Sequence, residues 1–441
     1  MLLHNLRLLT NDEKQSYFAD GAVCVQGNEI VALGDASELK QRYADEEQID
    51  MQGRLVMPGL INAHTHIYSA YARGMSNSKP TRNFIEILEN LWWALDKKLS
   101  LRDCKLSAYQ TMIESIKNGV TTLVDHHASP FACEGSLDQL AEAATELGIR
   151  ADLCYELSDR DGVEKRDQGV AENIRFIKRL QDQPHDLLRA HFGMHALFTL
   201  NDESMQMVAD ACEKYQAPVH CHCAEGIEDE YDSVKQHGCR VIERMSHYNL
   251  LNDRSFVVHL CHVNAREMDI IAENKAIAVH NPQSNMGNAV GRTPVRQLLD
   301  RGILLGLGTD AYTNDMIVSV ANAKTLLSHD LADPTHGFGE AATLLLNNNP
   351  KIASRLWGKQ LGVLKEGALA DLVAFDYTPY TPFSGDNFAG HLIFGFTGRM
   401  CTDSMINGKF VMRDRVILAV DEQEIAVESQ ARAQELWKHF Q

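Results

Sequence analysis

The chain has 441 residues, of which 44% are hydrophobic and 23% charged, and a formal net charge of -18. This length favours two domains or one large barrel with attachments. The negative charge argues against a nucleic-acid or anionic-membrane partner, because both need a basic face. The sequence contains no run of about 18 apolar residues, so no membrane span is expected. The ten cysteines show no paired C-x-x-C framework, and the chain starts with polar residues, so we expect a cytoplasmic protein with reduced thiols.

Short strands are predicted before residue 58, separated by turn signals such as Asn-Asp and Gly-Asn. They are Leu2–Leu9, Ala22–Gln26, Glu29–Leu33 and Leu55–Met57.

After Gly59 the pattern changes, because apolar segments of four to eight residues alternate with helical stretches such as Phe84–Lys98 and Asp103–Lys117. Eight strands are predicted: Gly59–His66, Val120–His126, Arg150–Glu156, Leu187–His195, Ala217–His222, Ser255–His259, Ala276–His280 and Ile303–Thr309. Such alternation predicts an α/β fold in which a (β/α)₈ TIM barrel closes. The alternative is an open doubly wound sheet, but no G-x-G-x-x-G follows the first strand.

Short strands return near Gly362. They are Leu372–Phe375, Ser404–Ile406, Lys409–Met412 and Arg415–Leu418, and a helix follows over Gln423–Phe440. Each strand-rich flank is small for a core of its own, so we expect the two to form one discontinuous β-sandwich domain. The predicted organisation is a sandwich part at 1–57, the barrel at 58–362, the second sandwich part at 363–420 and a C-terminal helix at 421–441.

Ligand-type side chains follow every predicted barrel strand, where chemistry collects in such folds. They are His64 and His66, Asp125 with His126 and His127, Glu156, His195, His220 with His222 and Glu225, His259 with His262, His280, and Asp310. Packing alone does not explain a polar side chain after all eight strands.

A metal site can be built from four of these residues. His64 and His66 share a strand face, and Asp310 supplies an oxygen. His222 is preferred over His220 as the third nitrogen because it lies nearer its strand end. Three histidines and a carboxylate suit Zn²⁺, with Fe²⁺ as the alternative. The fourth strand contains no lysine to bridge a second ion, so one metal per chain is expected.

Catalytic roles follow from this arrangement. Water bound to such a metal loses about 8–9 pKa units and becomes a hydroxide nucleophile near neutral pH. Asp310 can receive that proton, Glu225 can act as general acid or base, and His259 can steady the developing oxyanion.

Several assignments stay open on the sequence. Either His126 or His127 faces the pocket, with His127 favoured. Glu156 either touches substrate or pairs with Arg160. His262 and His280 are interpreted as supporting histidines that orient Asp310.

Four motifs in order carry a resemblance to a known family: Pro58-Gly-Leu-Ile-Asn-Ala-His64-Thr-His66, His222-Cys-Ala-Glu225, His280-Asn-Pro-Gln-Ser-Asn285 and Gly308-Thr-Asp310. The chain resembles the amidohydrolase superfamily, and within it the metal-dependent deaminase and chlorohydrolase branch. Asn90-Leu-Trp-Trp93, Asp125–Pro130 and Asn387–His391 resemble aminohydrolases of the SsnA type.

The resemblance implies one zinc or iron ion on His64, His66, His222 and Asp310, with Glu225 and His259 as catalytic partners. It implies that His195 approaches the substrate, with Arg73 as a further candidate, and that the chain forms a homodimer or larger oligomer.

The predicted function is hydrolytic deamination of a nitrogen heterocycle, and the resemblance favours a purine-derived one and a role in purine metabolism. The alternative is ring opening of a cyclic amide, or hydrolysis of another C–N or C–X bond, at the same site. A non-catalytic metal-binding protein is disfavoured, because binding alone does not require Glu225, His259 and Asp310 together.

Overall fold

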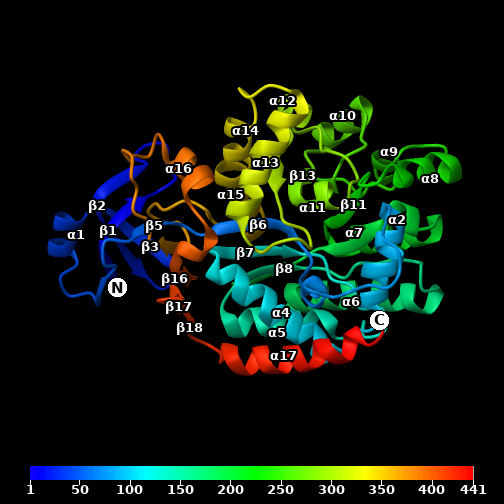
Figure 1. Cartoon of the computed structure of the whole chain (residues 1–441), viewed down its shortest axis with the longest axis horizontal. Coiled ribbons are helices and arrows are strands. Elements are labelled where there is room, and N and C mark those ends of the chain that lie inside the picture. Colours follow the sequence, from blue (N-terminus) through cyan, green and yellow to red (C-terminus); the bar gives the residue numbers. More distant parts are fainter. Residues whose placement is uncertain (441) are drawn as a thin grey trace.

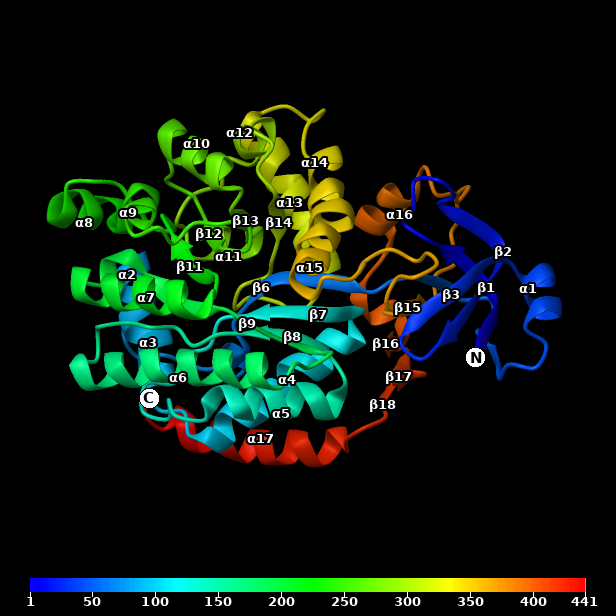
Figure 2. The same cartoon turned by 180° about the vertical axis from the view of Figure 1, so that it is seen from behind.

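The computed structural model describes residues 1–440, which form a β sheet built from both ends of the chain and a larger part with parallel strands (Figures 1 and 2). Helices lie around the outside of the parallel strands. Within the described residues, no helix combines the length and apolar character needed to cross a membrane.

The first sheet has nine strands in the order β18-β17-β16-β15-β5-β1-β2-β3, and β4 pairs with β1. Its members are β1 (Leu2–Leu9), β2 (Tyr17–Gln26), β3 (Glu29–Asp35), β4 (Gln48–Asp50), β5 (Leu55–Pro58), β15 (Leu372–Phe375), β16 (Cys401–Ile406), β17 (Lys409–Arg413) and β18 (Val416–Ile417). The two flanks of the chain meet where β5 pairs antiparallel with β15, for example Met57 opposite Val373. The flanks thus pair directly in one sheet, and a division into two stacked layers stays a prediction.

The parallel strands form two ladders, β6-β7-β8-β9 and β10-β11-β12-β13-β14. Their bounds are β6 (Leu60–Thr65), β7 (Val120–Asp125), β8 (Arg150–Leu153), β9 (Leu188–Ala190), β10 (Phe192–Ala196), β11 (Val219–Cys223), β12 (Phe256–His259), β13 (Ile277–His280) and β14 (Leu305–Leu307). The predicted single strand Leu187–His195 is divided at His191, whose ring bonds to Asp152 and to the carbonyl of Arg254. Single parallel bridges, Leu157 with Met194 and Thr65 with Asp310, link the two ladders at both of their edges.

Helices connect these strands. The longer ones are α4 (Leu101–Lys117), α5 (Ser136–Leu147), α6 (Val163–Asp182), α7 (Asp202–Tyr215), α8 (Ile227–His237), α9 (Val241–His247), α10 (Ala265–Asn274), α13 (Met316–Leu331), α15 (Asn349–Trp357) and α17 (Glu422–Trp437). The shorter ones are α1 (Ala36–Arg42), η1 (Ile67–Ala72), α2 (Phe84–Ile87), η2 (Leu88–Trp92), α3 (Trp93–Asp96), η3 (Leu197–Thr199), α11 (Pro282–Gly287), α12 (Val295–Asp300), α14 (Phe338–Thr343), η4 (Leu344–Asn348), α16 (Phe388–Gly395) and η5 (Gly398–Met400). The sequence did not predict α1 or β4, and the predicted helix Phe84–Lys98 is interrupted by the π-helical segment η2.

One buried amide joins the first and last parallel strands. The Asn349 side chain donates to the carbonyls of Ile61 in β6 (2.7 Å) and Leu307 in β14 (2.8 Å), and accepts from the Leu307 N–H (2.8 Å). Its position at the start of α15, directly after the π-helical η4, places it between the two strands. Asn349 therefore fixes the spacing of the strands that carry His64 and Asp310.

A buried ion pair connects the two parts of the molecule. Arg150 at the start of β8 is fully buried and donates two hydrogen bonds to Asp371, at 2.6 and 3.0 Å. Arg150 also donates to Asn407 and to the carbonyl of Asp186, so its donors are well used. Asp371 accepts in addition from the backbone N–H of Asn407, just after β16.

We expect Arg150→Ala to destabilise the protein by about 3–5 kcal/mol, because it leaves the Asp371 carboxylate buried and uncompensated. Urea and thermal unfolding measure the effect. Arg301→Ala is the matched control, since Arg301 pairs with Asp269 at the surface and exposed pairs contribute little. Equal stability of the two variants would contradict the structural role of Arg150.

Candidate active site

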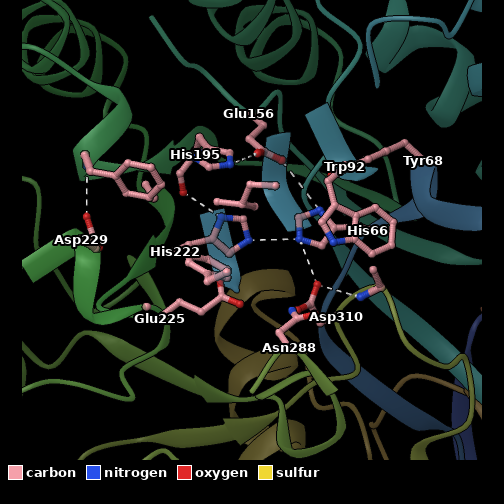
Figure 3. A pocket seen from close by; sticks show the side chains of 16 residues that line it. His66, Tyr68, Trp92, Glu156, His195, His222, Glu225, Asp229, Asn288 and Asp310 are labelled. Carbon is pink, nitrogen blue, oxygen red and sulfur yellow. Dashed lines mark hydrogen bonds and ion pairs between the residues drawn. The ribbon is translucent and has the colours of Figure 1, made fainter. Parts of the chain in front are cut away.

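Ligand-type side chains converge at the C-terminal ends of the parallel strands, as Figure 3 shows for His66, His222 and Asp310. His64 and His66 alternate with Thr65 at the end of β6, so both rings project to the same side, 4.9 Å apart. The Nε2 atom of His66 lies 3.1 Å from Nε2 of His222 and 3.2 Å from Oδ1 of Asp310. The Nε2 atom of His64 lies 4.0 Å from the same carboxylate oxygen.

The opposite edge of each imidazole is fixed by a hydrogen bond. Nδ1 of His66 donates to the carbonyl of His126 and Nδ1 of His222 to the carbonyl of His195, both at 2.7 Å. A carbonyl can only accept, so Nδ1 carries the proton and Nε2 of each neutral ring presents a lone pair to the cluster. The histidines are therefore oriented as metal ligands usually are, with the second nitrogen bonded behind.

His64 is held by a histidine instead of a carbonyl. Its Nδ1 lies 2.9 Å from Nε2 of His220, and Nδ1 of His220 lies 3.8 Å from the Cys154 sulfur. When His64 donates to His220, its Nε2 lone pair faces the cluster. This atom is buried and has no hydrogen-bond partner among residues 1–440. His220 thus lies behind His64, and His222 is the strand-five histidine that reaches the cluster.

The electrostatics of the cluster favour a cation. Burial, reinforced by the neighbouring imidazoles, lowers the pKa of His64 and His222 well below the usual value, so both stay neutral. At His66 burial also lowers the pKa, but the carboxylates of Asp310 and Glu156 outweigh it and the net pKa is raised. Imidazole lone pairs that face one another beside a carboxylate are therefore stabilised by a proton or a metal ion between them.

The donor set fits a divalent metal. Three imidazole nitrogens and a carboxylate oxygen are ligands that Zn²⁺ accepts at about 2.0–2.2 Å, which places neighbouring donors about 3.4 Å apart in a tetrahedral site. The observed separations of 3.1, 3.2 and 4.0 Å surround that value. His64, His66, His222 and Asp310 are therefore the residues that could hold the ion.

Backbone contacts place Asp310 beside these histidines. The N–H groups of Thr309 and Asp310 both donate to the carbonyl of His64, at 2.9 and 3.0 Å. Asp310 adopts a left-handed conformation with φ of 53°, which is uncommon for a residue other than glycine and often marks a functional site. The Ser284 hydroxyl donates to Oδ2 and the N–H of Ala311 to Oδ1.

His259 and Glu225 face Asp310 from the neighbouring strand ends. Nε2 of His259 lies 3.6 Å from Glu225 and 3.7 Å from Asp310, while its Nδ1 donates to the amide oxygen of Asn285. Burial and the Asp310 carboxylate raise the pKa of Glu225 well above its usual range. A raised pKa favours the protonated form, which is the form that a general acid requires.

His280 and His262 lie behind this region as supporting histidines. His280 donates to the Thr293 hydroxyl, which in turn donates to the carbonyl of His259. His262 bonds to the carbonyl of Val290. The hydrogen bonds of these two histidines therefore do not orient Asp310, which is instead held by Ser284.

Glu156 and His195 line the cavity together. Oε1 of Glu156 lies 3.1 Å from Nε2 of His195, and Oε2 lies 3.4 Å from Nδ1 of His126. Burial opposes ionisation, but His195 and His126 outweigh it and lower the pKa of Glu156. Arg160 is not its partner, because that guanidinium pairs with Asp96.

Two predicted substrate contacts lie elsewhere. Arg73 is exposed and pairs with Glu114 at 2.6 Å, on the side where α4 faces α17. His127 is buried, with Nε2 bonded to the Ser129 hydroxyl, and does not line the cavity. His126, the alternative, packs against His66 and His222. The sequence could not resolve which way these side chains turn, because His127 lies just beyond β7 and Arg73 follows the 3-10 helix η1.

Most of the outer cavity wall was not predicted. It is formed by Tyr68, Phe84, Leu88, Trp92 and Phe198, with Asn288 nearer the cluster. Leu88 and Trp92 are the first and last residues of η2. Residues four positions apart share one face of a helix, so both side chains reach the cavity from the same side.

A model of the amidohydrolase family matches residues 55–411. The chain belongs to the amidohydrolase family. This amidohydrolase is 27% identical over 435 residues to a 5-methylthioadenosine/S-adenosylhomocysteine deaminase of Halothermothrix orenii, covering 96% of this chain and 97% of the relative. It is 29% identical to a 5'-deoxyadenosine deaminase of Methanocaldococcus jannaschii, covering 91% and 93%.

Among solved structures, an adenosine deaminase of Xanthomonas campestris with bound zinc superposes with a TM-score of 0.87 at 23% identity, covering 99% of this chain and 98% of the other. A guanine deaminase of C. acetobutylicum with bound guanine gives 0.80 at 18% identity, covering 93% and 99%. At such low identity these two likenesses concern the fold of the amidohydrolase and not its substrate.

The hydrogen bond between His64 and His220 leads to a testable prediction. His220→Ala removes the acceptor for Nδ1 of His64, so we expect zinc affinity to fall about 10–100-fold, measured by competition with a coloured chelator. His220→Asn, which retains an acceptor, should lose less.

His247→Ala serves as the control, because His247 is exposed. Thermal unfolding checks that each variant is folded. Unchanged zinc affinity in folded His220→Ala would show that His220 does not orient the ligand.

Proposed function

We propose that this amidohydrolase is a metal-dependent aminohydrolase that deaminates a purine-derived nitrogen heterocycle by hydrolysis. The observation that carries the proposal is geometric: His64, His66 and His222 meet at Asp310, and His259 lies between Asp310 and Glu225. The relatives named as deaminases, which align over nearly the whole chain, support the reaction type.

The architecture we infer is a closed (β/α)₈ barrel beside a discontinuous β domain. Three observations support closure: the sequential parallel ladders, the bridge between Thr65 and Asp310, and the Asn349 contacts between β6 and β14. We also infer a homo-oligomer in the cytoplasm, on the family resemblance and the unpaired cysteines.

One divalent ion per chain, Zn²⁺ or alternatively Fe²⁺, would be held by His64, His66, His222 and Asp310. When bound, such an ion lowers the pKa of a water molecule so that it can attack near neutral pH. The zinc-containing structures of related fold support this choice of metal.

The protein's own groups move the protons. Asp310 lies within reach of both His259 and the ligand histidines, so it can accept the proton of the attacking water. Glu225 can give its proton to a ring nitrogen, and His259 can stabilise the oxygen that becomes negative. A C–O bond forms at the carbon bearing the amino group and the C–N bond breaks. The amino group takes the proton that Asp310 accepted and leaves as ammonia, while the new hydroxyl group returns a proton to Glu225 as it becomes a carbonyl.

Loss of a ligand tests the metal assignment. We expect His64→Ala to lose most of its bound metal and release no detectable ammonia from a panel of purines, pyrimidines and their oxidised forms. Metal content and ammonia are measured on the same sample, with His247→Ala as control. A wild-type protein that is fully metallated and releases no ammonia from any panel member would refute the proposal. Consumption of substrate without ammonia would indicate ring opening instead.

Loss of the proton donor gives a different result. Glu225→Gln is expected to keep its metal, because Glu225 is not a ligand, while kcat falls by about 10²–10⁴-fold. Stopped-time ammonia assays and metal analysis measure the two quantities. If this variant kept normal kcat, another group would have to supply the proton.

A further inference from the structure

The cavity above the proposed metal site contains no cationic side chain of lysine or arginine among its lining residues. Its acidic side chains are Glu156, Glu225, Asp229 and Asp310. The nearby guanidinium of Arg160 is neutralised by Asp96 and does not line the cavity. Away from the proposed metal ion, a phosphate or carboxylate on the substrate would therefore meet acidic side chains and no lysine or arginine.

The outer wall of the cavity is apolar. Phe84, Leu88 and Trp92, from α2 and η2, belong with Phe198 to one hydrophobic cluster. Phe84 lies directly against the loop after Glu225, since a methyl group added to Gly226 would come within 2.5 Å of its ring. Sugar hydroxyls placed against this wall would be desolvated without hydrogen-bond partners.

Two further polar side chains near this wall are already used. Asp229 accepts from the N–H groups of Ala224 and Phe198. Asn288 donates to Ser284 and accepts from the Tyr312 hydroxyl. His195 is engaged as well, since its Nε2 contacts Glu156 and Trp93 and its Nδ1 lies 3.3 Å from the Thr199 hydroxyl. The polar side chains left for recognition of the substrate are Glu156, Glu225 and Tyr68.

Glu156 has spare acceptor capacity. Its carboxylate is buried, and Oε2 makes no hydrogen bond within the part of the chain that the structure describes, although Nδ1 of His126 lies 3.4 Å away. A buried carboxylate oxygen favours an N–H donor. A free heterocyclic base offers a ring N–H at the position where a nucleoside carries its sugar.

We propose that the substrate is a free heterocyclic base: a planar aminoheterocycle that carries neither sugar nor phosphate and donates a ring N–H to Glu156. The aromatic wall packs against its faces and edge, while the amino-bearing carbon points to the histidine cluster. This inference rests on the proposed deaminase function and narrows it. It separates this chain from relatives whose names specify nucleosides.

The test compares three matched sets on the zinc-loaded, full-length protein. Ammonia release is measured for free bases (adenine, guanine, cytosine and 8-oxoguanine), for their nucleosides and for their 5'-monophosphates. We expect the best base to exceed its own nucleoside by at least about 100-fold in kcat/KM, the order of discrimination that unpaired buried polar groups produce. The monophosphates should give no detectable ammonia.

Variants of the wall test its role. Phe84→Ala should narrow the base-to-nucleoside ratio by at least about tenfold, because it opens space and admits water beside the sugar. Leu88→Ala is a second variant in case the first does not fold. Phe131→Ala is the control, since Phe131 is exposed and lies outside the cavity.

The outcomes separate the two proposals. Ammonia from nucleosides but not from bases overturns the present inference and leaves the deaminase function standing. Ammonia from none of the three sets, with zinc bound, overturns the deaminase function for these compounds and this inference with it. A ratio that stays unchanged in two folded wall variants also overturns the inference, because the wall would then not exclude the sugar.

Discussion

The site depends on buried imidazole nitrogens whose lone pairs face one another and are given no hydrogen-bond donor by the described part of the protein. Hydrogen bonds from Nδ1 to the carbonyls of His126 and His195 fix the tautomers of His66 and His222, so their Nε2 atoms face each other at 3.1 Å. Two facing acceptors beside a carboxylate repel one another unless a cation lies between them. Backbone hydrogen bonds thus hold these imidazoles in an arrangement that favours a bound metal ion.

Strand pairing brings the proposed ligand residues together. His64 both directs Nε2 into the cluster and, through its carbonyl, receives the N–H groups of Thr309 and Asp310. A shift between β6 and β14 would therefore displace a nitrogen ligand and the oxygen ligand at the same time. The Asn349 amide holds the same two strands, at Ile61 near the start of β6 and at Leu307 at the end of β14. Chain segments distant in sequence are thereby kept in the register that the metal geometry requires.

The prediction of this centre rests on periodic information. Alternation along β6 places His64 and His66 on one face, and position along β11 favours His222 over His220, which the structure places behind His64. His127 follows a strand end and Arg73 follows the 3-10 helix η1, where no strand period applies, and neither residue lines the cavity. The strand order of the mixed sheet could not be predicted either, because pairing between strands distant in sequence depends on tertiary contacts.

The outer wall was also unpredictable from the sequence. Leu88 and Trp92 lie four positions apart on η2 and so share a helix face, and this spacing is as typical of a buried core as of a cavity wall. Within the wall, Tyr68 packs edge-on against His66, with ring centroids 5.4 Å apart. A change at Tyr68 would therefore reach the histidine cluster, whereas Leu88 and Trp92 make no hydrogen bond to its residues. On the proposed function, the histidine cluster supplies the chemistry and the residues of α2 and η2 bear on which heterocycle reaches it.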